Sequence, residues 1–187
     1  MSFKLKFTFL FFITIQLGFS QEIENAAILK VLLTKAYVNE KVIVKNRLQL
    51  LNFYCNKAPN NEETLEVISK NDLLKKNAEI IKKQIDITIN EDWSKEFNIL
   101  FTDQHQYLKS KVNDCLSLED FQKVSTQYGE NNQRLMIVSK PMYFSKNYCL
   151  VKVAFYRNIE HNSGCFYLFE KKNTIWTIIE TLNEWST

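Results

Sequence analysis

The sequence predicts an α+β protein, with amino-terminal helices packed on a carboxy-terminal antiparallel β-meander. Apolar residues recur at helical spacing through much of residues 21–130, whereas from residue 131 onward they follow a period of two. Ten of the 19 aromatic residues that follow position 20 fall between Tyr143 and Trp185, as expected of strands. Helices in one half and strands in the other form the α+β pattern. We therefore expect one domain over residues 21–187, with a curled, cone-like sheet as an alternative shape.

Residues 1–20 have the features of a secretory signal peptide. Lys4 and Lys6 form a basic start, a mostly apolar run of 13 residues covers 7–19, and Ser20 ends a small-x-small cleavage pattern before Gln21. A membrane span needs about 20 apolar residues, so this run is too short to be an anchor. We expect cleavage between Ser20 and Gln21. The product would be periplasmic or secreted, with no membrane insertion after cleavage.

Composition argues against several classes of function. Loss of residues 1–20 leaves 22 of the 24 basic groups against 21 acidic ones, which gives no electrostatic case for binding nucleic acid. The three glycines cannot build a Gly-rich phosphate loop, and the two histidines, at positions 105 and 161, cannot form a two-histidine helix site. No cofactor and no metal is expected, and a non-enzymatic role is favoured over catalysis.

The helical half begins with a broad apolar stripe that predicts a helix from Glu22 to about Lys35. A β-branched run over residues 42–44 then predicts a short strand, with one long helix through to Asn56 as the alternative. Residues 57–61, which contain Pro59, break the pattern.

Two capping boxes mark later helix starts. Asn60 with Glu63 predicts one start, a second helical stretch follows Asn71, and residues 98–101 are a candidate short strand. Residues 117–120 (Ser-Leu-Glu-Asp) predict a helix that runs to about Tyr128 and ends at Gly129. Four strands are predicted after it, at 134–139, 148–157, 164–171 and 174–181.

The turn between the second and third of these strands permits a register prediction. If Asn158 faces Ser163, then Phe155 faces Phe166 and Val153 faces Leu168. The second face of the hairpin is then also apolar, and a sheet with two apolar faces must be covered on both sides or present one face to a ligand. The candidate ligand-binding residues on that face are Tyr148, Tyr156, Tyr167 and Phe169.

Export would place the four cysteines, Cys55, Cys115, Cys149 and Cys165, in an oxidising compartment where disulfides form. In the predicted register Cys149 and Cys165 lie roughly 23 Å apart, whereas a disulfide needs Cα atoms within about 7 Å. A Cys149–Cys165 bond is therefore excluded. Three arrangements stay open: Cys55 and Cys115 each bonded to a strand cysteine, a single bridge, or four free thiols.

Other reactive side chains have simpler interpretations. His161, in the turn near Cys165, reads as a solvated loop residue, and His105 with Asp103 reads as surface. Adjacent carboxylates at 62–63 and 119–120 are explained by helix starts, since neighbouring positions on a helix do not converge. The sequence therefore predicts no catalytic residue.

The carboxy-terminal third contains a series of turn and strand residues: Val138-Ser139-Lys140-Pro141, Phe144-Ser145-Lys146, Tyr148, Leu150-Val151, Gly164, Tyr167-Leu168, Glu170-Lys171-Lys172, Trp176 and Trp185-Ser186. In these residues the chain resembles a family of secreted bacterial proteins of unknown function. The shared residues are turn and strand signatures, so the resemblance implies no catalytic residue. The order of elements is also similar to the cone-shaped nuclear-transport-factor-like fold, a likeness of layout that implies no activity.

Two functions follow from these observations. The first is an exported, non-enzymatic binding or structural module of the bacterial envelope, with an unknown protein or small-molecule partner. The alternative is a small-ligand-binding protein or enzyme with a cone-shaped pocket lined by the tyrosines.

Overall fold

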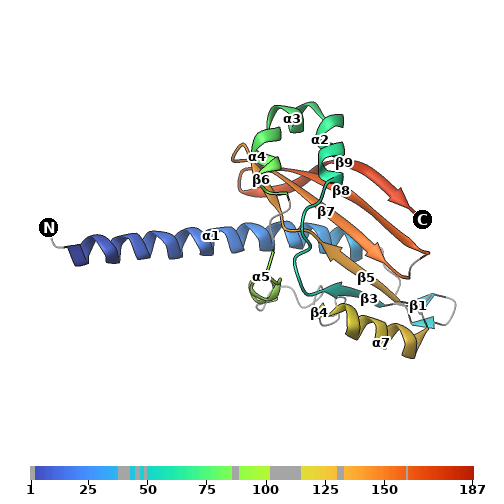
Figure 1. The fold of residues 1–187 in the computed structure, drawn as a ribbon. Coiled ribbons are helices and arrows are strands. Elements are labelled where there is room, and N and C mark those ends of the chain that lie inside the picture. Colours follow the sequence, from blue (N-terminus) through green and yellow to red (C-terminus); the bar gives the residue numbers. More distant parts are fainter. Residues whose placement is uncertain are drawn as a thin grey trace.

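A seven-stranded mixed sheet organises the computed structural model, which describes residues 3–37, 43–44, 47–48, 50–85, 89–101, 115–129, 133–158 and 160–187 (Figure 1). Its strand order is β4-β3-β5-β7-β8-β9, and β6 pairs with β7. The strands are β3 (Leu50–Tyr54), β4 (Cys115–Leu116), β5 (Gln133–Val138), β6 (Met142–Phe144), β7 (Tyr148–Tyr156), β8 (Asn162–Lys172) and β9 (Ile175–Ser186). Strands β1 (Ile43–Val44) and β2 (Arg47–Leu48) pair separately.

The predicted α+β class is confirmed, and so is the antiparallel run of strands in the carboxy-terminal part. Strands β5, β7, β8 and β9 pair antiparallel in that order. Two features differ from the prediction. Strands β3 and β4 come from the half that was expected to be helical, and β3 pairs parallel to both β4 and β5. Over the described residues the sheet is open, with β4 and β9 at its edges, and does not close into a cone.

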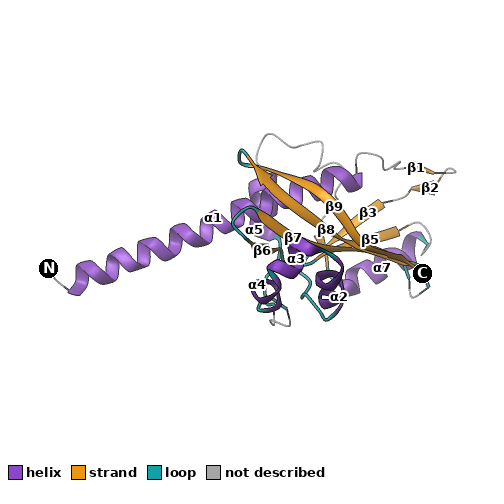
Figure 2. Ribbon diagram, turned by 90° about the horizontal axis from the view of Figure 1, so that it is seen from above, coloured by secondary structure: helices purple, strands orange, loops and turns teal. Residues whose placement is uncertain are grey.

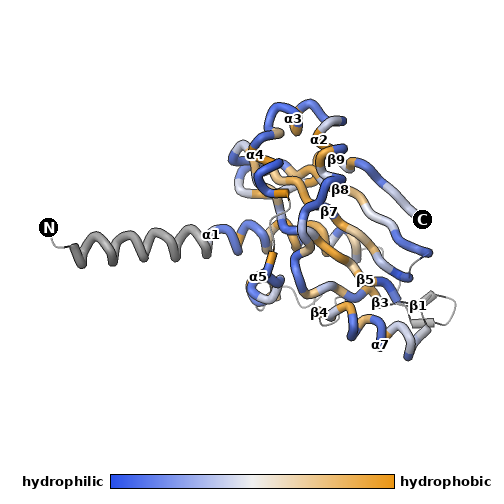
Figure 3. The backbone as a smooth tube through the Cα atoms, in the orientation of Figure 1, coloured by the Kyte–Doolittle hydropathy of each residue, from blue (hydrophilic) through white to orange (hydrophobic). Residues whose placement is uncertain are grey.

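Helices cover both faces of this sheet (Figure 2). Helices α1 (Phe3–Tyr37) and α5 (Ser94–Leu100) pack on one face, where the core includes Leu29, Leu32, Val151 and Phe169. Helices α2 (Glu63–Lys70), α3 (Asp72–Lys76) and α4 (Ala78–Lys82) pack on the other face, against Leu150, Phe166 and Leu168. Apolar residues concentrate where these helices meet the strands (Figure 3). Both apolar faces of the sheet are therefore covered by helices, as one of the two predicted outcomes requires.

Helix α1 is longer than predicted and includes the expected signal segment. Its first half extends away from the sheet (Figure 1), and its buried side chains, among those described, begin at Asn25. None of the helices in the described parts of the chain combines the length and apolar character that a membrane crossing requires. The alternative of one helix through to Asn56 is wrong, because α1 ends at Tyr37 and β3 occupies residues 50–54.

The helix starts confirm one capping box and correct the other. Ser117 precedes α7 (Leu118–Tyr128), its Oγ accepts from the Asp120 backbone N–H at 3.1 Å, and Gly129 ends the helix with a φ of 91°. Asn60 does not cap α2; instead its side chain donates to the Lys140 carbonyl at 3.0 Å. The strand predicted at residues 98–101 is wrong, because most of this segment lies in α5.

The β7–β8 register differs from the prediction by three positions. Phe155 pairs with Ser163, and Val153 pairs with Cys165. The cause is a tight turn, in which the Asn158 side chain accepts from the backbone N–H groups of Glu160 and His161 at 3.0 and 2.9 Å. Strand β8 therefore begins at residue 162, earlier than expected. The shift is an odd number of residues. Relative to the side chains of β7, every β8 side chain therefore lies on the face opposite to the predicted one.

Gly164 is required by close packing in β8. A Cβ atom built there would lie 2.7 Å from both Trp185 Cζ2 and the Val153 carbonyl oxygen. The Trp185 ring thus covers a backbone position that has no side chain. Gly164→Ala is expected to lower the free energy of unfolding by about 1–3 kcal/mol through overpacking. Urea denaturation checks this, and an unchanged midpoint would show that the ring moves aside freely.

Candidate functional site

A cleft of about 410 Å³, lined by polar side chains, lies beside α1. We call it the polar cleft. Its walls come from α1, the segment after β3, the residues before and within α5, and the turn after β5. The lining residues are Gln21, Glu22, Asn25, Lys57, Asn90, Glu91, Asp92, Lys95 and Lys140.

A buried ion pair supports the wall of the polar cleft. Lys57 is 5% exposed and Glu96 is fully buried, and Lys57 Nζ lies 2.8 Å from Glu96 Oε1. The Lys57 amine also lies 5.1 Å from the centre of the Trp93 ring, a cation–π distance. Buried charges are destabilising unless they are paired and hydrogen-bonded. The second oxygen of Glu96, Oε2, is buried and has no hydrogen-bond partner among the residues that the structure describes.

Asn25 extends this pair across to the sheet. Its Nδ2 donates to Glu96 Oε1 at 2.9 Å, and its Oδ1 accepts from the Tyr143 hydroxyl at 2.7 Å. Burial raises the pKa of Tyr143, and the nearby carboxylates of Glu24 and Glu96 raise it further. Tyr143 therefore stays protonated and serves as a donor. The network joins α1, α5 and β6 through side chains alone.

The rim of the polar cleft holds a second layer of charges. Glu91 accepts from Lys57 at 3.2 Å and from Lys140, and Lys95 pairs with Glu22 at 2.7 Å. Partial burial opposes ionisation of Glu91, but the hydrogen bonds from Lys140 and Lys57 hold its pKa below the usual value. Glu91 is therefore a carboxylate at neutral pH. The rim thus presents amines and carboxylates side by side.

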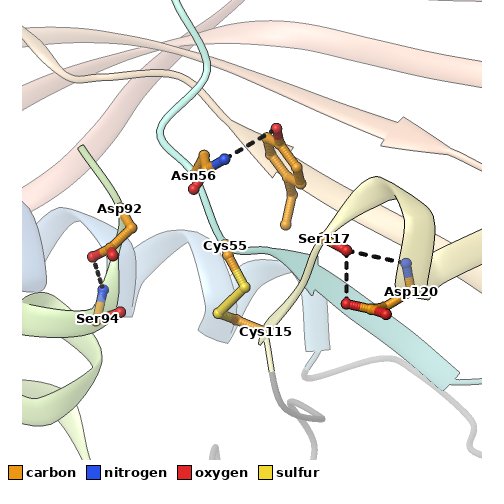
Figure 4. The surroundings of a disulfide bond; sticks show 8 residues. Cys55, Asn56, Asp92, Ser94, Cys115, Ser117 and Asp120 are labelled. Atoms are coloured by element: carbon orange, nitrogen blue, oxygen red, sulfur yellow. Dashed lines mark hydrogen bonds between the residues drawn. A yellow bond between two sulfur atoms is a disulfide. The ribbon is translucent and has the colours of Figure 1, made fainter. Parts of the chain in front are cut away.

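The backbone around Cys55 holds Lys57 in place. Cys55 follows β3 directly and forms a disulfide with Cys115 at the start of β4 (Figure 4). The backbone N–H of Trp93 donates to the backbone carbonyl of Cys55 at 3.0 Å, and the backbone N–H of Lys57 donates to the backbone carbonyl of Glu91 at 3.0 Å. The disulfide therefore anchors the strand end from which Lys57 projects.

The four candidate residues of the predicted hairpin face do not come together. In the observed register Tyr148 and Tyr156 lie on one face of the sheet, whereas Tyr167 and Phe169 lie on the other. Phe169 is fully buried in the core against α1. The shared tyrosine-lined face is therefore wrong as a geometric prediction, because it depended on the predicted register.

Each of the three tyrosines has a different neighbour. Tyr148 stacks on Phe144, and Tyr167 lies under the Lys35 amine, 5.5 Å from its ring centre. Tyr156 packs edge-to-face against Phe121 and lines a groove of about 550 Å³ beside α7.

The cysteines adopt one of the arrangements that the sequence left open, a single bridge between Cys55 and Cys115. Cys149 and Cys165 are buried free thiols, and burial raises the pKa of both. Cys165 faces Val153, four residues along β7 from Cys149, a separation of roughly 13 Å. That distance is too great for a disulfide in the observed register as well.

The remaining reactive residues stay apart in the described part of the chain. His161 is exposed in the β7–β8 turn, while Asp103 and His105 lie outside the described residues. Among the residues that the structure describes, no group of three or more His, Cys, Asp or Glu side chains could hold a metal ion. Comparisons with models of protein families, with curated proteins and with solved structures find no match to this chain.

Proposed function

We propose that the chain is an exported, non-enzymatic binding protein of the bacterial envelope that takes a small zwitterionic ligand in the polar cleft. The observation that carries this proposal is the buried Lys57–Glu96 pair at the wall of an open cleft. Burying two charges is destabilising relative to apolar residues of the same volume, so a pair placed beside a cleft marks a functional-site candidate.

The division of helix α1 supports export. Its described buried side chains begin at Asn25, four residues after Gln21, and the first half of the helix extends away from the sheet (Figure 1). Cleavage between Ser20 and Gln21 would therefore leave the buried part of the helix intact. The resemblance of the carboxy-terminal strands to secreted bacterial proteins supports the same assignment.

The charge pattern supports a zwitterion as the ligand. Lys57, Lys95 and Lys140 supply three amines to the polar cleft, and Glu22, Glu91 and Asp92 supply three carboxylates. A ligand with one ammonium and one carboxylate, such as an amino acid or a short peptide, can pair with both kinds of group. A ligand with a single charge would meet repulsion from three of the six charged residues in the lining.

Calorimetric titration tests the binding proposal, with the dipeptide glycylglycine as the probe. We expect heat of binding for glycylglycine and none for acetate or methylamine, which each carry half of its charge. In Lys57→Met/Glu96→Leu, which replaces the buried pair by apolar side chains, the affinity is expected to fall at least about tenfold. Equal binding of acetate, or an unchanged affinity in the double variant, would count against the polar cleft.

Export is tested separately by intact mass. Expressed with its leader in a secreting bacterium, the chain should be recovered from the periplasm or medium with a mass that starts at Gln21. A cytoplasmic product that retains residues 1–20 would refute export and leave the binding result untouched.

A further inference from the structure

The turn of helix α1 that follows the expected cleavage point is held on the rest of the protein by polar side chains. Glu22 pairs with Lys95 at 2.7 Å, and Glu24 accepts a hydrogen bond from the Trp176 indole N–H at 2.6 Å. Asn25 follows with the two buried hydrogen bonds described above. These contacts fix this turn of the helix beside the polar cleft.

Gln21 precedes these contacts and lines the polar cleft with an exposed side chain. In the full-length chain its nitrogen belongs to the peptide bond with Ser20. Cleavage between Ser20 and Gln21, the step of the proposed function on which this inference rests, would convert that nitrogen into a primary amine. An amine and a carboxamide would then belong to one residue. Because the Gln21 side chain is exposed, it can turn back onto the amine without breaking packed contacts.

The charges around position 21 disfavour a permanent ammonium group there. The polar cleft already contains three amines, from Lys57, Lys95 and Lys140, and its three carboxylates balance them. An α-ammonium would add a fourth cation to this lining. It would also stand at the start of a helix, where the helix dipole disfavours positive charge. A neutral amino-terminal residue avoids both effects.

We propose that Gln21 cyclises to pyroglutamate after cleavage, and that the resulting lactam forms part of the polar cleft. The α-amine nitrogen attacks Cδ of its own carboxamide, so that a bond between that nitrogen and Cδ forms and the Cδ–Nε2 bond breaks. Nε2 leaves as ammonia with the hydrogen that the amine gives up, so the step consumes neither an oxidant nor a co-reactant. The product is neutral, with one N–H donor and one carbonyl acceptor at the edge of the polar cleft.

Cyclisation protects the start of helix α1 against peptidases. Aminopeptidases require a free α-amine, and proteolysis concentrates at chain termini. Removal of residues 21–25 would delete the contacts of Glu22 and Glu24 and the hydrogen bond that Asn25 donates to Glu96. The lactam therefore protects the surroundings of the buried ion pair as well as the end of the helix.

Mass and amino-terminal sequencing of the exported protein test the cyclisation. Expressed with its leader in a secreting bacterium, the natural chain should have the mass of residues 21–187 less one ammonia. Stepwise sequencing should give no signal until pyroglutamyl aminopeptidase removes the first residue. Gln21→Asn is the matched control, because its side chain is one methylene shorter and would have to close a strained four-membered ring. This variant should be exported with its full mass and a readable first residue.

The same measurements distinguish this inference from export. The full mass of residues 21–187 with a free amine, or a blocked amine in Gln21→Asn as well, would overturn the cyclisation and leave export intact. A chain that retains residues 1–20 would overturn both. Ligand binding enters neither measurement, so a failure of glycylglycine to bind is recognised separately.

Digestion with a broad-specificity aminopeptidase tests the protective role. The natural chain should keep its mass, whereas Gln21→Asn should lose residues from its start. Once Asn25 is removed, the trimmed variant should unfold at a lower urea concentration, because Glu96 has lost a hydrogen-bond donor. Equal trimming of the two chains, or equal resistance, would overturn the protective role.

Discussion

Lys57→Ala is expected to lower the free energy of unfolding by about 3–5 kcal/mol, as measured by urea denaturation. The substitution removes the amine that pairs with the fully buried Glu96, whose other hydrogen-bond donor among the described residues is the uncharged Asn25 amide. It also removes the amine from the face of the Trp93 ring and weakens the support of Glu91. The large loss of stability therefore comes from leaving the buried Glu96 carboxylate without its positive partner, and not from the loss of a single contact.

Two further variants distinguish this cause from simple loss of packing. Lys57→Met/Glu96→Leu removes both charges while keeping apolar volume, and its stability is expected to match or exceed that of the natural chain by up to about 4 kcal/mol. Lys95→Ala removes an exposed rim amine that pairs with Glu22 and should leave the unfolding midpoint unchanged. A loss for Lys57→Ala below about 1 kcal/mol, the range of an exposed pair, would contradict burial of Glu96.

The double variant also separates stability from function. If the buried pair served folding alone, a more stable double variant would bind glycylglycine as the natural chain does. The proposed function requires the opposite, a folded protein that has lost binding. Stability and affinity measured on the same variant therefore carry independent information.

Local chemistry explains which elements could be predicted from the sequence. The start of α7 is correct because Ser117 and Asp120 satisfy each other within a single turn, and Gly129 supplies the positive φ at its end. The four predicted strands of the carboxy-terminal part are found as β5, β7, β8 and β9, because a period of two persists over several residues in each. The short strand β6 was not predicted. In each correct case the deciding interactions lie within a few positions of one another.

Most errors in the predicted elements arise where contacts between residues far apart in the sequence determine the local structure. Asn60 has the sequence of a helix cap, but its side chain is taken by the carbonyl of Lys140, 80 positions away. Strand β3 pairs parallel with β5 across a long stretch of chain, so no turn motif marks the pairing. The β7–β8 register failed for a different reason, since the Asn158 turn allowed a shorter loop than the one expected.

The candidate site was not predictable for the same physical reason. Lys57 and Glu96 are 39 positions apart, and Asn25 and Glu96 are 71 apart. Each residue has an ordinary local interpretation: Lys57 lies in a break marked by Pro59, and Glu96 lies in the first turn of α5, where acidic residues are common. Burial of these charges follows from the way α1 and α5 pack on the sheet. An apolar stripe predicts that one side of a helix packs against the core. It does not predict which side chains the polar residues of that helix will contact.

Removal of the disulfide is the second change with a large expected effect. Cys55→Ser/Cys115→Ser is expected to lower the free energy of unfolding by about 4 kcal/mol, because the bond closes a loop with a sequence separation of 60 residues and restricts the unfolded chain. The same change frees β4 from the end of β3 and loosens the backbone that carries Lys57. Binding of glycylglycine should therefore weaken together with stability.

Reductant provides the matched control for this prediction. Dithiothreitol should destabilise the natural chain by about the same amount as the double substitution, while the stability of Cys55→Ser/Cys115→Ser should not respond. The buried thiols Cys149 and Cys165 are present in both proteins, so any effect that depends on them appears in both titrations. Mass spectrometry of unreduced peptides should show a Cys55–Cys115 link. Detection of a Cys149–Cys165 link would contradict the β7–β8 register, since that register places those two residues four positions apart along the hairpin.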